Sequence, residues 1–470
     1  MTETQHSTIK KKLLNSNAWL AIGPLLAVLV GGIAAFLGLE TKAVITLSIT
    51  LWCAVWWVSE PIPIAATSLI PMALFPLLGV LSTKQIAGAY GHTLILLLMG
   101  GFLLSKAMEK SGTHRRIALQ MIHLFGGTSG SKVLLGFMVA AAFLSMWISN
   151  TATTLMLLPV ALAVLETNKD RRLVTALLLG IAYASSIGGI GTPIGTPPNM
   201  LFRGVYEENT GQTITFSQWM GWAVPVVILF IPLVWLWLKR GLDQNNQLHV
   251  PSPGLWRVEE RRVIMIFALT ATLWITRNEP FGGWSEWLSV AHANDASIAL
   301  AAAVLMFIVS DGKGGKLLDW PTAVQIPWGV LILFGGGIAI AQAFQASGLS
   351  QLVGEQLSVI ADFPLWLVIP IICLAVTFIT EVTSNTATTT LLMPILAATG
   401  LAIGIDPALI MAPAAMSASC AFMLPVATAP NAVVFGSEKL TVKQMSSRGF
   451  VLNLIGVAVI SVCCLWLISQ

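Results

Sequence analysis

The sequence predicts an all-α polytopic membrane protein with about eleven transmembrane helices and two re-entrant helical hairpins in an inverted repeat. Of its 470 residues, 56% are apolar and only 10% are charged, whereas a soluble protein carries about a quarter charged residues. The apolar runs are too long for the strands of a membrane barrel, so helices are expected. The hexapeptide Ser-Asn-Thr-Ala-Thr-Thr occurs at 149–154 and again at 384–389, which indicates an internal duplication.

The composition argues against several other classes of protein. The net charge is only +4, and no basic, aromatic-interleaved patch suggests binding to nucleic acid. The five cysteines lie in apolar runs, and the six histidines are scattered without metal-ligand spacing, so a metalloenzyme is not indicated. An intramembrane enzyme would need a nucleophile–base pair or metal ligands near the bilayer centre, and the sequence offers neither. We therefore expect no enzymatic activity and no cofactor.

Eleven apolar runs follow one another along the chain. The first, at about 17–38, comes after Lys10, Lys11 and Lys12 and is interpreted as a retained helix, not a cleaved signal peptide. The other runs lie at roughly 43–58, 63–81, 92–107, 173–190, 216–238, 263–276, 297–310, 326–344, 409–424 and 449–469. Two longer stretches, about 131–166 and 363–402, each consist of a pair of apolar segments with one copy of the hexapeptide at the centre.

Basic residues orient these runs through the positive-inside rule. If the basic N-terminus lies inside, the fourth, sixth, eighth and tenth runs should end inside. Lysine and arginine residues stand at or after the end of each of these runs: Lys106, Lys110, Arg115 and Arg116; Lys239 and Arg240; Lys313 and Lys316; Lys439, Lys443 and Arg448. The sequence therefore predicts a cytoplasmic N-terminus.

The same rule places the two hexapeptide-bearing pairs on opposite faces of the membrane. Lys132 precedes the first pair and Lys169, Arg171 and Arg172 follow it, whereas no Lys or Arg stands between Gln345 and Met411. One hairpin therefore enters from each side, as an inverted repeat requires. Each pair either stops in mid-membrane or crosses it fully; the polar tips favour stopping, where protein or water can solvate them.

Two further landmarks repeat in the same order. Gly100-Gly101 and Gly336-Gly337 are displaced by 236 residues, and the segments 191–199 and 423–431 by 232. We therefore divide the chain into an N-terminal segment with the first helix (1–42), a first repeat (43–240), a cytoplasmic linker (241–262) and a second repeat (263–470). Hairpin 131–166 lies in the first repeat on the cytoplasmic side, and hairpin 363–402 in the second on the outer side.

The Ser-Asn-Thr triplets at 149–151 and 384–386 are candidate binding sites. Ser, Asn and Thr are strong helix N-cap residues, so each triplet is expected to start the second helix of its pair. Capping alone is the simpler interpretation, but a cap needs one such residue and each tip has three. Their hydroxyl and amide groups, together with the positive end of a helix dipole, suit a carboxylate.

The segments Gly191–Asn199 and Met423–Asn431 contain the prolines Pro193, Pro197, Pro198, Pro425 and Pro430. They are interpreted either as kinks or as breaks in a helix whose freed carbonyl oxygens coordinate a cation such as Na⁺. Neither these segments nor the tips contain Lys, Arg or His, so bound Na⁺ would have to offset the charge of an anionic substrate. Glu381, three residues before the second tip, is interpreted as a structural carboxylate.

At these residues the chain resembles the divalent anion:sodium symporter family, the INDY-type dicarboxylate transporters. The resemblance is carried by both Ser-Asn-Thr tips and by the segment A-S-C-A-F-M-L-P-V-A-T-A-P-N-A-V-V from Ala418 to Val434. It implies a homodimer in the inner membrane of a bacterium. In each protomer, a transport domain would move like an elevator against a scaffold domain that includes residues 1–42, and the two domains would be interleaved between the repeats. Ala429 departs from the proline that the family often carries there.

The resemblance also implies roles for individual residues. The first sodium site would use Ser145, Asn150 and the backbone at Gly195, and the second Thr380, Asn385 and the backbone at Ala427. The substrate carboxylates would meet Ser149, Asn150, Thr151, Ser384, Asn385 and Thr386, with Thr196 and Thr428 nearby.

The function this implies is import of C4-dicarboxylates such as succinate, malate and fumarate together with Na⁺. Two alternatives share the fold: a sodium-independent dicarboxylate exchanger, and a transporter of citrate or sulfate. A receptor or structural membrane protein is less consistent with two opposed polar hairpins.

Overall fold

A computed structural model describes residues 3–127, 129–165, 170–242, 248, 250–278, 282–290, 292–357 and 363–468, without the side chains of 3–17. The regular elements across these residues are all helices, and the one β pairing is an isolated bridge between Ser310 and Lys316. Residue 166 and Lys169, placed by the sequence at the end of the first hairpin and just after it, lie outside the described ranges. The predicted all-α class is confirmed.

The first part of the chain forms six helices: α1 (Glu3–Phe36), α2 (Thr41–Ser59), α3 (Ile64–Thr67), α4 (Leu69–Leu77), α5 (Thr83–Tyr90) and α6 (Thr93–Ser111). The predicted run 63–81 is thus divided into two short helices. Pro71 explains the division, because it has no N–H to donate to the carbonyl of Thr67, the last residue of α3.

Helix α7 (Thr113–Phe125) was not predicted from the sequence. Gly112 adopts φ 74°, a left-handed conformation that ends α6 and lets the chain turn. Polar and apolar residues then alternate with helical spacing over one amphipathic helix. Because its apolar residues are separated by polar ones, this helix has no continuous apolar run in the sequence. Helix α18 (Leu349–Leu357), which follows Gly348 in the second half, was missed for the same reason.

The two hexapeptide-bearing pairs fold as helix–turn–helix units close to their predicted limits. The first consists of α8 (Gly130–Ser145) and α9 (Asn150–Leu165), and the second of α19 (Leu365–Ile379) and α20 (Asn385–Ala402). Each hexapeptide therefore stands at the junction of its two helices, as predicted.

The predicted helix breaks are also present. Helix α10 (Arg171–Ile190) ends before the first proline-rich segment, and α11 (Pro197–Thr210) begins within it. In the second half, α21 (Ala408–Ala418) is followed by α22 (Ala429–Phe435). The apolar run 409–424 therefore overestimates this helix, because its last residues belong to the extended segment between α21 and α22.

The linker 241–262 is shorter than the sequence indicated, because α13 (Val258–Ile275) begins inside it. At the start of this helix the backbone N–H of Arg257 donates to Glu260 Oε2 at 2.8 Å, and Glu260 also pairs with Arg116 of α7 at 2.5 Å. Charged residues within the predicted linker therefore form the first turn of a helix and its ion pairs. The remaining helices are α12 (Phe216–Leu238), α14 (Gly283–Trp287), α15 (Asp295–Ile308), α16 (Trp320–Ala323), α17 (Trp328–Ala346) and α23 (Val442–Ile468).

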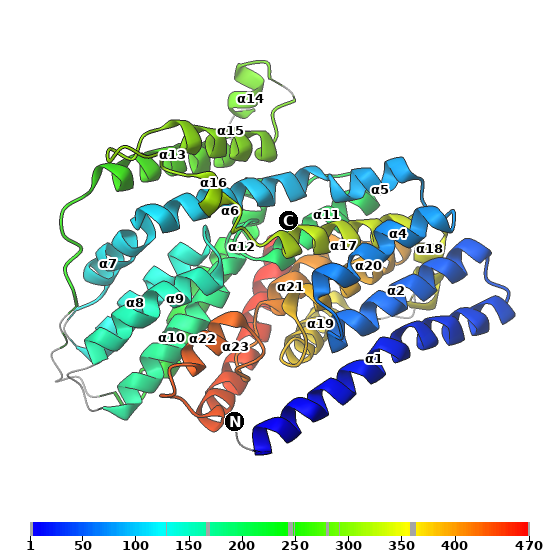
Figure 1. Cartoon of the computed structure of the whole chain (residues 1–470), viewed down its shortest axis with the longest axis horizontal. Helices are drawn as coiled ribbons and strands as arrows, with labels where there is room; N and C mark the ends of the chain where they lie inside the picture. Colours follow the sequence, from blue (N-terminus) through cyan, green and yellow to red (C-terminus); the bar gives the residue numbers. More distant parts are fainter. Residues whose placement is uncertain are drawn as a thin grey trace.

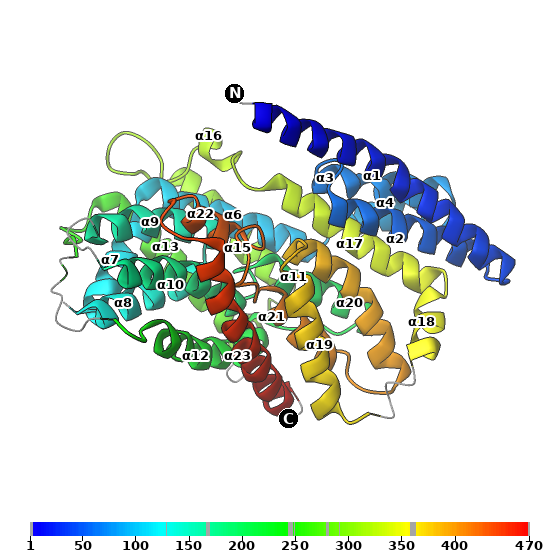
Figure 2. The same ribbon diagram turned by 90° about the horizontal axis from the view of Figure 1, so that it is seen from below.

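Two groups of helices flank a central one (Figures 1 and 2). One outer group contains α1, α2, α4 and α17, and the other contains α7, α8, α9, α10 and α12. Helices α20, α21 and α23 lie between them, and the short α22 packs against α9 and α10 on the side that faces the central group.

Seven helical segments in the described ranges are long and apolar enough to cross a membrane: Ala18–Phe36, Thr41–Ser59, Thr83–Ser111, Arg171–Ile190, Phe216–Leu238, Trp328–Ala346 and Val442–Ile468. Shorter apolar helices, including both hexapeptide-bearing pairs, accompany them. The chain is therefore a multi-pass membrane protein. The count of eleven spans and the re-entrant course of the hairpins stay predictions.

Candidate functional site

The two Ser-Asn-Thr triplets begin α9 and α20. Ser149 Oγ accepts a hydrogen bond from the backbone N–H of Ala152 at 3.2 Å, which is an N-cap contact. Ser384 is the N-cap of α20, but its side chain makes no capping bond. The capping interpretation therefore accounts for one hydroxyl at the first tip and for none at the second. Capping therefore does not account for the other polar groups of the triplets.

Each tip is tied to the end of the preceding helix by a short side-chain hydrogen bond. Ser145 Oγ donates to Asn150 Oδ1 at 2.6 Å, and Thr380 Oγ1 donates to Asn385 Oδ1 at 2.6 Å. Both hydroxyl-bearing residues are fully buried. Each half therefore contains the same hydrogen bond, from a hydroxyl to the amide oxygen five residues later.

Buried asparagines hold the two broken segments. Asn199 Nδ2 donates to the carbonyls of Gly189, Ile190 and Thr192 at 2.7–3.2 Å. In the second half, Asn431 Nδ2 donates to the carbonyls of Ala421 and Leu424, both at 3.0 Å. These amides satisfy carbonyls that a continuous helix would have paired internally.

Gly195, in the first broken segment, lies close to the backbone at the end of α8. A side chain at Gly195 would place its Cβ 2.4 Å from the carbonyl oxygen of Gly189 and 3.0 Å from that of Ser145. Glycine is therefore required for this close approach. Thr196 and Thr428 are the N-cap residues of α11 and α22, and Thr428 Oγ1 accepts from the N–H of Asn431 at 3.2 Å.

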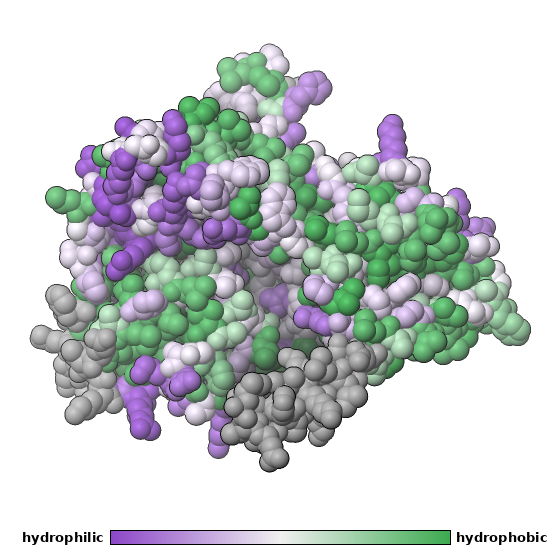
Figure 3. Space-filling model, viewed as in Figure 1, coloured by the Kyte–Doolittle hydropathy of each residue, from purple (hydrophilic) through white to green (hydrophobic). Residues whose placement is uncertain are grey.

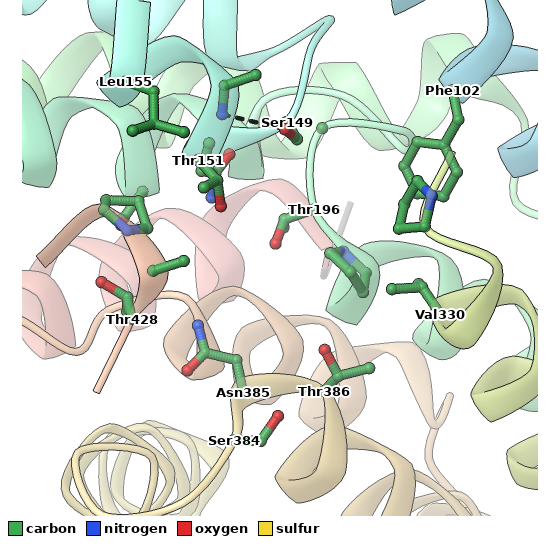
Figure 4. A pocket seen from close by; sticks show the side chains of 18 of the residues that line it. Phe102, Ser149, Thr151, Leu155, Thr196, Val330, Ser384, Asn385, Thr386 and Thr428 are labelled. Carbon is green, nitrogen blue, oxygen red and sulfur yellow. Dashed lines mark hydrogen bonds between the residues drawn. The ribbon is translucent and has the colours of Figure 1, made fainter. Parts of the chain in front are cut away.

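Both tips and both broken segments open onto one cavity of about 1180 Å³. Figure 3 shows a hollow near the centre of the face that it presents, with hydrophilic surface inside. In Figure 4, Thr196 lies between the labelled residues of the first tip and those of the second. The cavity wall includes these predicted residues: Ser149, Asn150, Thr151, Gly195, Thr196, Ser384, Asn385, Thr386, Ala427 and Thr428. Ser145 and Thr380 stand behind it, bonded to the asparagines.

The cavity wall also contains residues that the sequence did not single out. Lys106 and Glu109 of α6 form an ion pair at 2.6 Å, and His114 of α7 lies beside them in the wall. Burial lowers the pKa of His114, which keeps the imidazole neutral near pH 7, with Nδ1 2.9 Å from the carbonyl of Met108. The sequence placed Lys106 at the cytoplasmic end of its helix. It gave no signal that this end faces the hairpin tips.

Glu381 has the structural role that the sequence indicated. It is 3% exposed and accepts hydrogen bonds from the backbone N–H groups of Phe422, Met423 and Leu424 and from Asn453. It does not line the cavity, so it is no direct contact for a ligand there.

The fold and the cavity define a class of protein: a multi-pass helical membrane protein whose polar cavity is built from two helix junctions and two helix breaks. The family model described as "Sodium:sulfate symporter transmembrane region" matches residues 15–469. The chain therefore belongs to this family of divalent anion:sodium symporters.

Curated relatives extend the similarity over most of the chain. A "sodium-dependent dicarboxylate transporter SdcS" of Staphylococcus saprophyticus is 42% identical over 466 residues, which cover 94% of this chain and 89% of the relative. The protein of the same description from Staphylococcus aureus (strain NCTC 8325) is 43% identical with the same coverage.

Two solved structures share the fold at low sequence identity. The YdaH transporter of Alcanivorax borkumensis has a TM-score of 0.58 and 14% identity, covering 90% of this chain and 98% of its own. MtrF of Neisseria gonorrhoeae has a TM-score of 0.62 and 12% identity, covering 96% of this chain and 94% of its own.

Proposed function

We propose that this protein is a secondary active transporter that imports C4-dicarboxylates such as succinate, malate and fumarate together with Na⁺. The carrying observation is the cavity in which both Ser-Asn-Thr tips and both helix breaks meet. Its hydroxyl and amide groups lie at the beginnings of α9 and α20, where helix dipoles favour a carboxylate. The naming of the staphylococcal relatives as sodium-dependent dicarboxylate transporters supports the same conclusion.

The two carboxylates of the substrate would bind Ser149, Asn150 and Thr151 at one tip and Ser384, Asn385 and Thr386 at the other, with Thr196 and Thr428 beside them. This arrangement is supported by the common cavity wall. Two tips facing one cavity suit a ligand with an anionic group at each end.

Sodium ions would bind behind the two tips. The first site would use Ser145, Asn150 and the Gly195 backbone; the second would use Thr380, Asn385 and the Ala427 backbone. Hydroxyl, amide and carbonyl oxygens are the ligands that a hard cation prefers. The short contacts within each Ser–Asn or Thr–Asn pair support the proposal, because they bring two such oxygens together.

The homodimer, the two re-entrant hairpins, the interleaved scaffold and transport domains and the elevator motion belong to this proposal. So do the bacterial inner membrane and the cytoplasmic N-terminus. Lys106, Glu109 and His114 lie near the cytoplasmic end of α6 in this topology, and they line the same cavity as the tips. The cavity would therefore open toward the cytoplasm, which corresponds to the inward-facing state of an elevator.

The test is uptake of radiolabelled succinate into proteoliposomes that carry the purified protein. An inward Na⁺ gradient is compared with K⁺ and with choline, and protein-free liposomes are the control. We expect uptake with Na⁺ alone, and competition by unlabelled malate and fumarate.

Other outcomes would contradict the proposal. Equal uptake in all three salts, increased by dicarboxylate inside the vesicles, would identify a sodium-independent exchanger. Inhibition by citrate or sulfate but not by malate would assign a different anion to the same site.

A further inference from the structure

Glu381 connects the second hairpin to the broken segment that faces it. Its Oε1 accepts from the N–H groups of Phe422 at 2.7 Å and Met423 at 2.9 Å, and its Oε2 accepts from that of Leu424 at 3.1 Å. Asn453 Nδ2 of α23 donates to Oε1 at 2.7 Å. All four neighbours are donors. Three of them are backbone N–H groups, which can only donate and which contact both carboxyl oxygens, so this surrounding suits the carboxylate.

The peptide groups that Glu381 holds lead directly to Ala427. The carbonyl of Leu424 accepts from the N–H of Ala427 at 3.2 Å and from Asn431 Nδ2 at 3.0 Å. Two peptide units before that of Leu424, the carbonyl of Phe422 accepts from the hydroxyl of Tyr183 at 2.8 Å. The segment 422–427 is thus fixed at successive peptide units, and Glu381 supplies three of the contacts.

The first half of the chain makes the corresponding connection without a charge. Met146 stands 235 residues before Glu381, which is the displacement of the hexapeptides. There the hydroxyl of Thr192 donates to the backbone carbonyl of Met146, so the tie between hairpin and broken segment is neutral. The two halves therefore share their asparagines and hydroxyls but differ by one buried negative charge.

We propose that Glu381 is a positioning residue for the second sodium site and gives it a charge that the first site lacks. Its carboxylate holds segment 422–427 so that the Ala427 backbone faces Thr380 and Asn385. Its negative charge, one residue from Thr380, favours a cation at that point. The two sodium sites are consequently unequal. This inference rests on the proposed function, because it takes the sodium sites from it.

The test measures the Na⁺ dependence of succinate uptake by Glu381→Gln, Glu381→Asp and, as the matched control in the first half, Met146→Gln. Glu381→Gln removes the charge and turns an N–H donor toward the N–H of Leu424. We expect the Na⁺ concentration for half-maximal uptake to rise about tenfold or more, because a charge-assisted hydrogen bond is lost. Glu381→Asp keeps the charge and should recover part of the affinity, while Met146→Gln should resemble the wild type.

A second measurement separates sodium affinity from a general structural effect. Na⁺ without substrate should raise the melting temperature of the detergent-solubilised wild type, since a ligand that binds the folded state stabilises it. Glu381→Gln should need about tenfold more Na⁺ for the same rise. If Glu381→Gln is not monodisperse, Asn453→Leu takes its place as the test, because it removes one donor to Glu381 and keeps the charge of the carboxylate. It should raise the Na⁺ requirement by a smaller factor.

The possible results are distinct. A folded Glu381→Gln variant with the wild-type Na⁺ requirement would overturn the inference, and so would an unchanged Asn453→Leu where that variant decides. Sodium-independent uptake by the wild type would instead refute the proposed function.

Discussion

The hydroxyl of Thr380 offers a direct test of the second sodium site. It donates to Asn385 Oδ1 at 2.6 Å and also lies 3.1 Å from the carbonyl oxygen of Ala418, at the end of α21. Thr380→Val keeps the shape of the side chain and removes the oxygen. The variant therefore deletes one proposed Na⁺ ligand and the donor that two buried acceptors share.

The size of the effect follows from these contacts. A buried acceptor that loses its donor costs about 1–3 kcal/mol, and about 1.4 kcal/mol corresponds to a factor of ten in affinity. We expect Thr380→Val to raise the Na⁺ concentration for half-maximal uptake by about tenfold. Ser145→Ala removes a hydroxyl with one such contact, to Asn150, so its loss of thermal stability should be smaller.

Proteoliposome uptake at a series of Na⁺ concentrations measures the change in the Na⁺ requirement. Thermal unfolding in detergent measures the loss of stability in Thr380→Val and in Ser145→Ala. Thr380→Ser restores the oxygen and is the matched control, expected to keep a Na⁺ requirement near that of the wild type. If Thr380→Val folds and its Na⁺ requirement is unchanged, the hydroxyl is not a sodium ligand, and the assignment of the second site is wrong.

Three further predictions concern the site and its support. Asn150→Ala and Asn385→Ala should each abolish uptake and leave expression and size-exclusion behaviour intact; normal uptake in either would refute the site. Gly188→Ala should lower the melting temperature, because its Cβ would lie 2.2 Å from the backbone oxygen of Ala142 in α8 and overpacking costs about 1–3 kcal/mol. Gly221→Ala, which meets nothing within 4 Å, should not; equal losses would contradict the packing argument. Asp295→Asn leaves two arginines without their buried partner and should destabilise by about 3–5 kcal/mol, as measured by thermal unfolding; an unchanged melting temperature would show that the pair contributes nothing.

The sequence predicts those parts of the fold that continuous apolar runs or proline define. The Ser-Asn-Thr triplets stand at helix starts, and the helices end at the proline-rich segments, because N-capping and proline act locally. The predicted limits of α8, α9, α19 and α20 differ little from the observed ones for the same reason. Local chemistry alone determines these boundaries.

Features that depend on long-range contacts could not be predicted in this way. The predicted linker 241–262 contains the start of α13, where Glu260 pairs with Arg116 and Glu259 pairs with Lys313. No local pattern distinguishes a solvated charge from one with a distant partner.

The cavity wall was only partly predictable for a similar reason. The repeat identified the tips and the breaks, because each half carries a copy of the same motif. Lys106, Glu109 and His114 have no such copy, and their place in the wall depends on how α6 and α7 pack.

The charge balance of the cavity joins substrate and sodium in one physical argument. Among the described residues of the wall, the cationic side chain is that of Lys106, and Glu109 already neutralises it at 2.6 Å, while Glu60 adds a further acidic side chain. A dicarboxylate would therefore carry two negative charges to tips whose hydroxyl and amide groups are neutral dipoles, and such a charge is expensive within a membrane. Two Na⁺ ions behind the tips would balance it. Because these balancing charges are mobile, neither the substrate nor the sodium would readily cross alone, and under the proposed function this requirement would couple their movement.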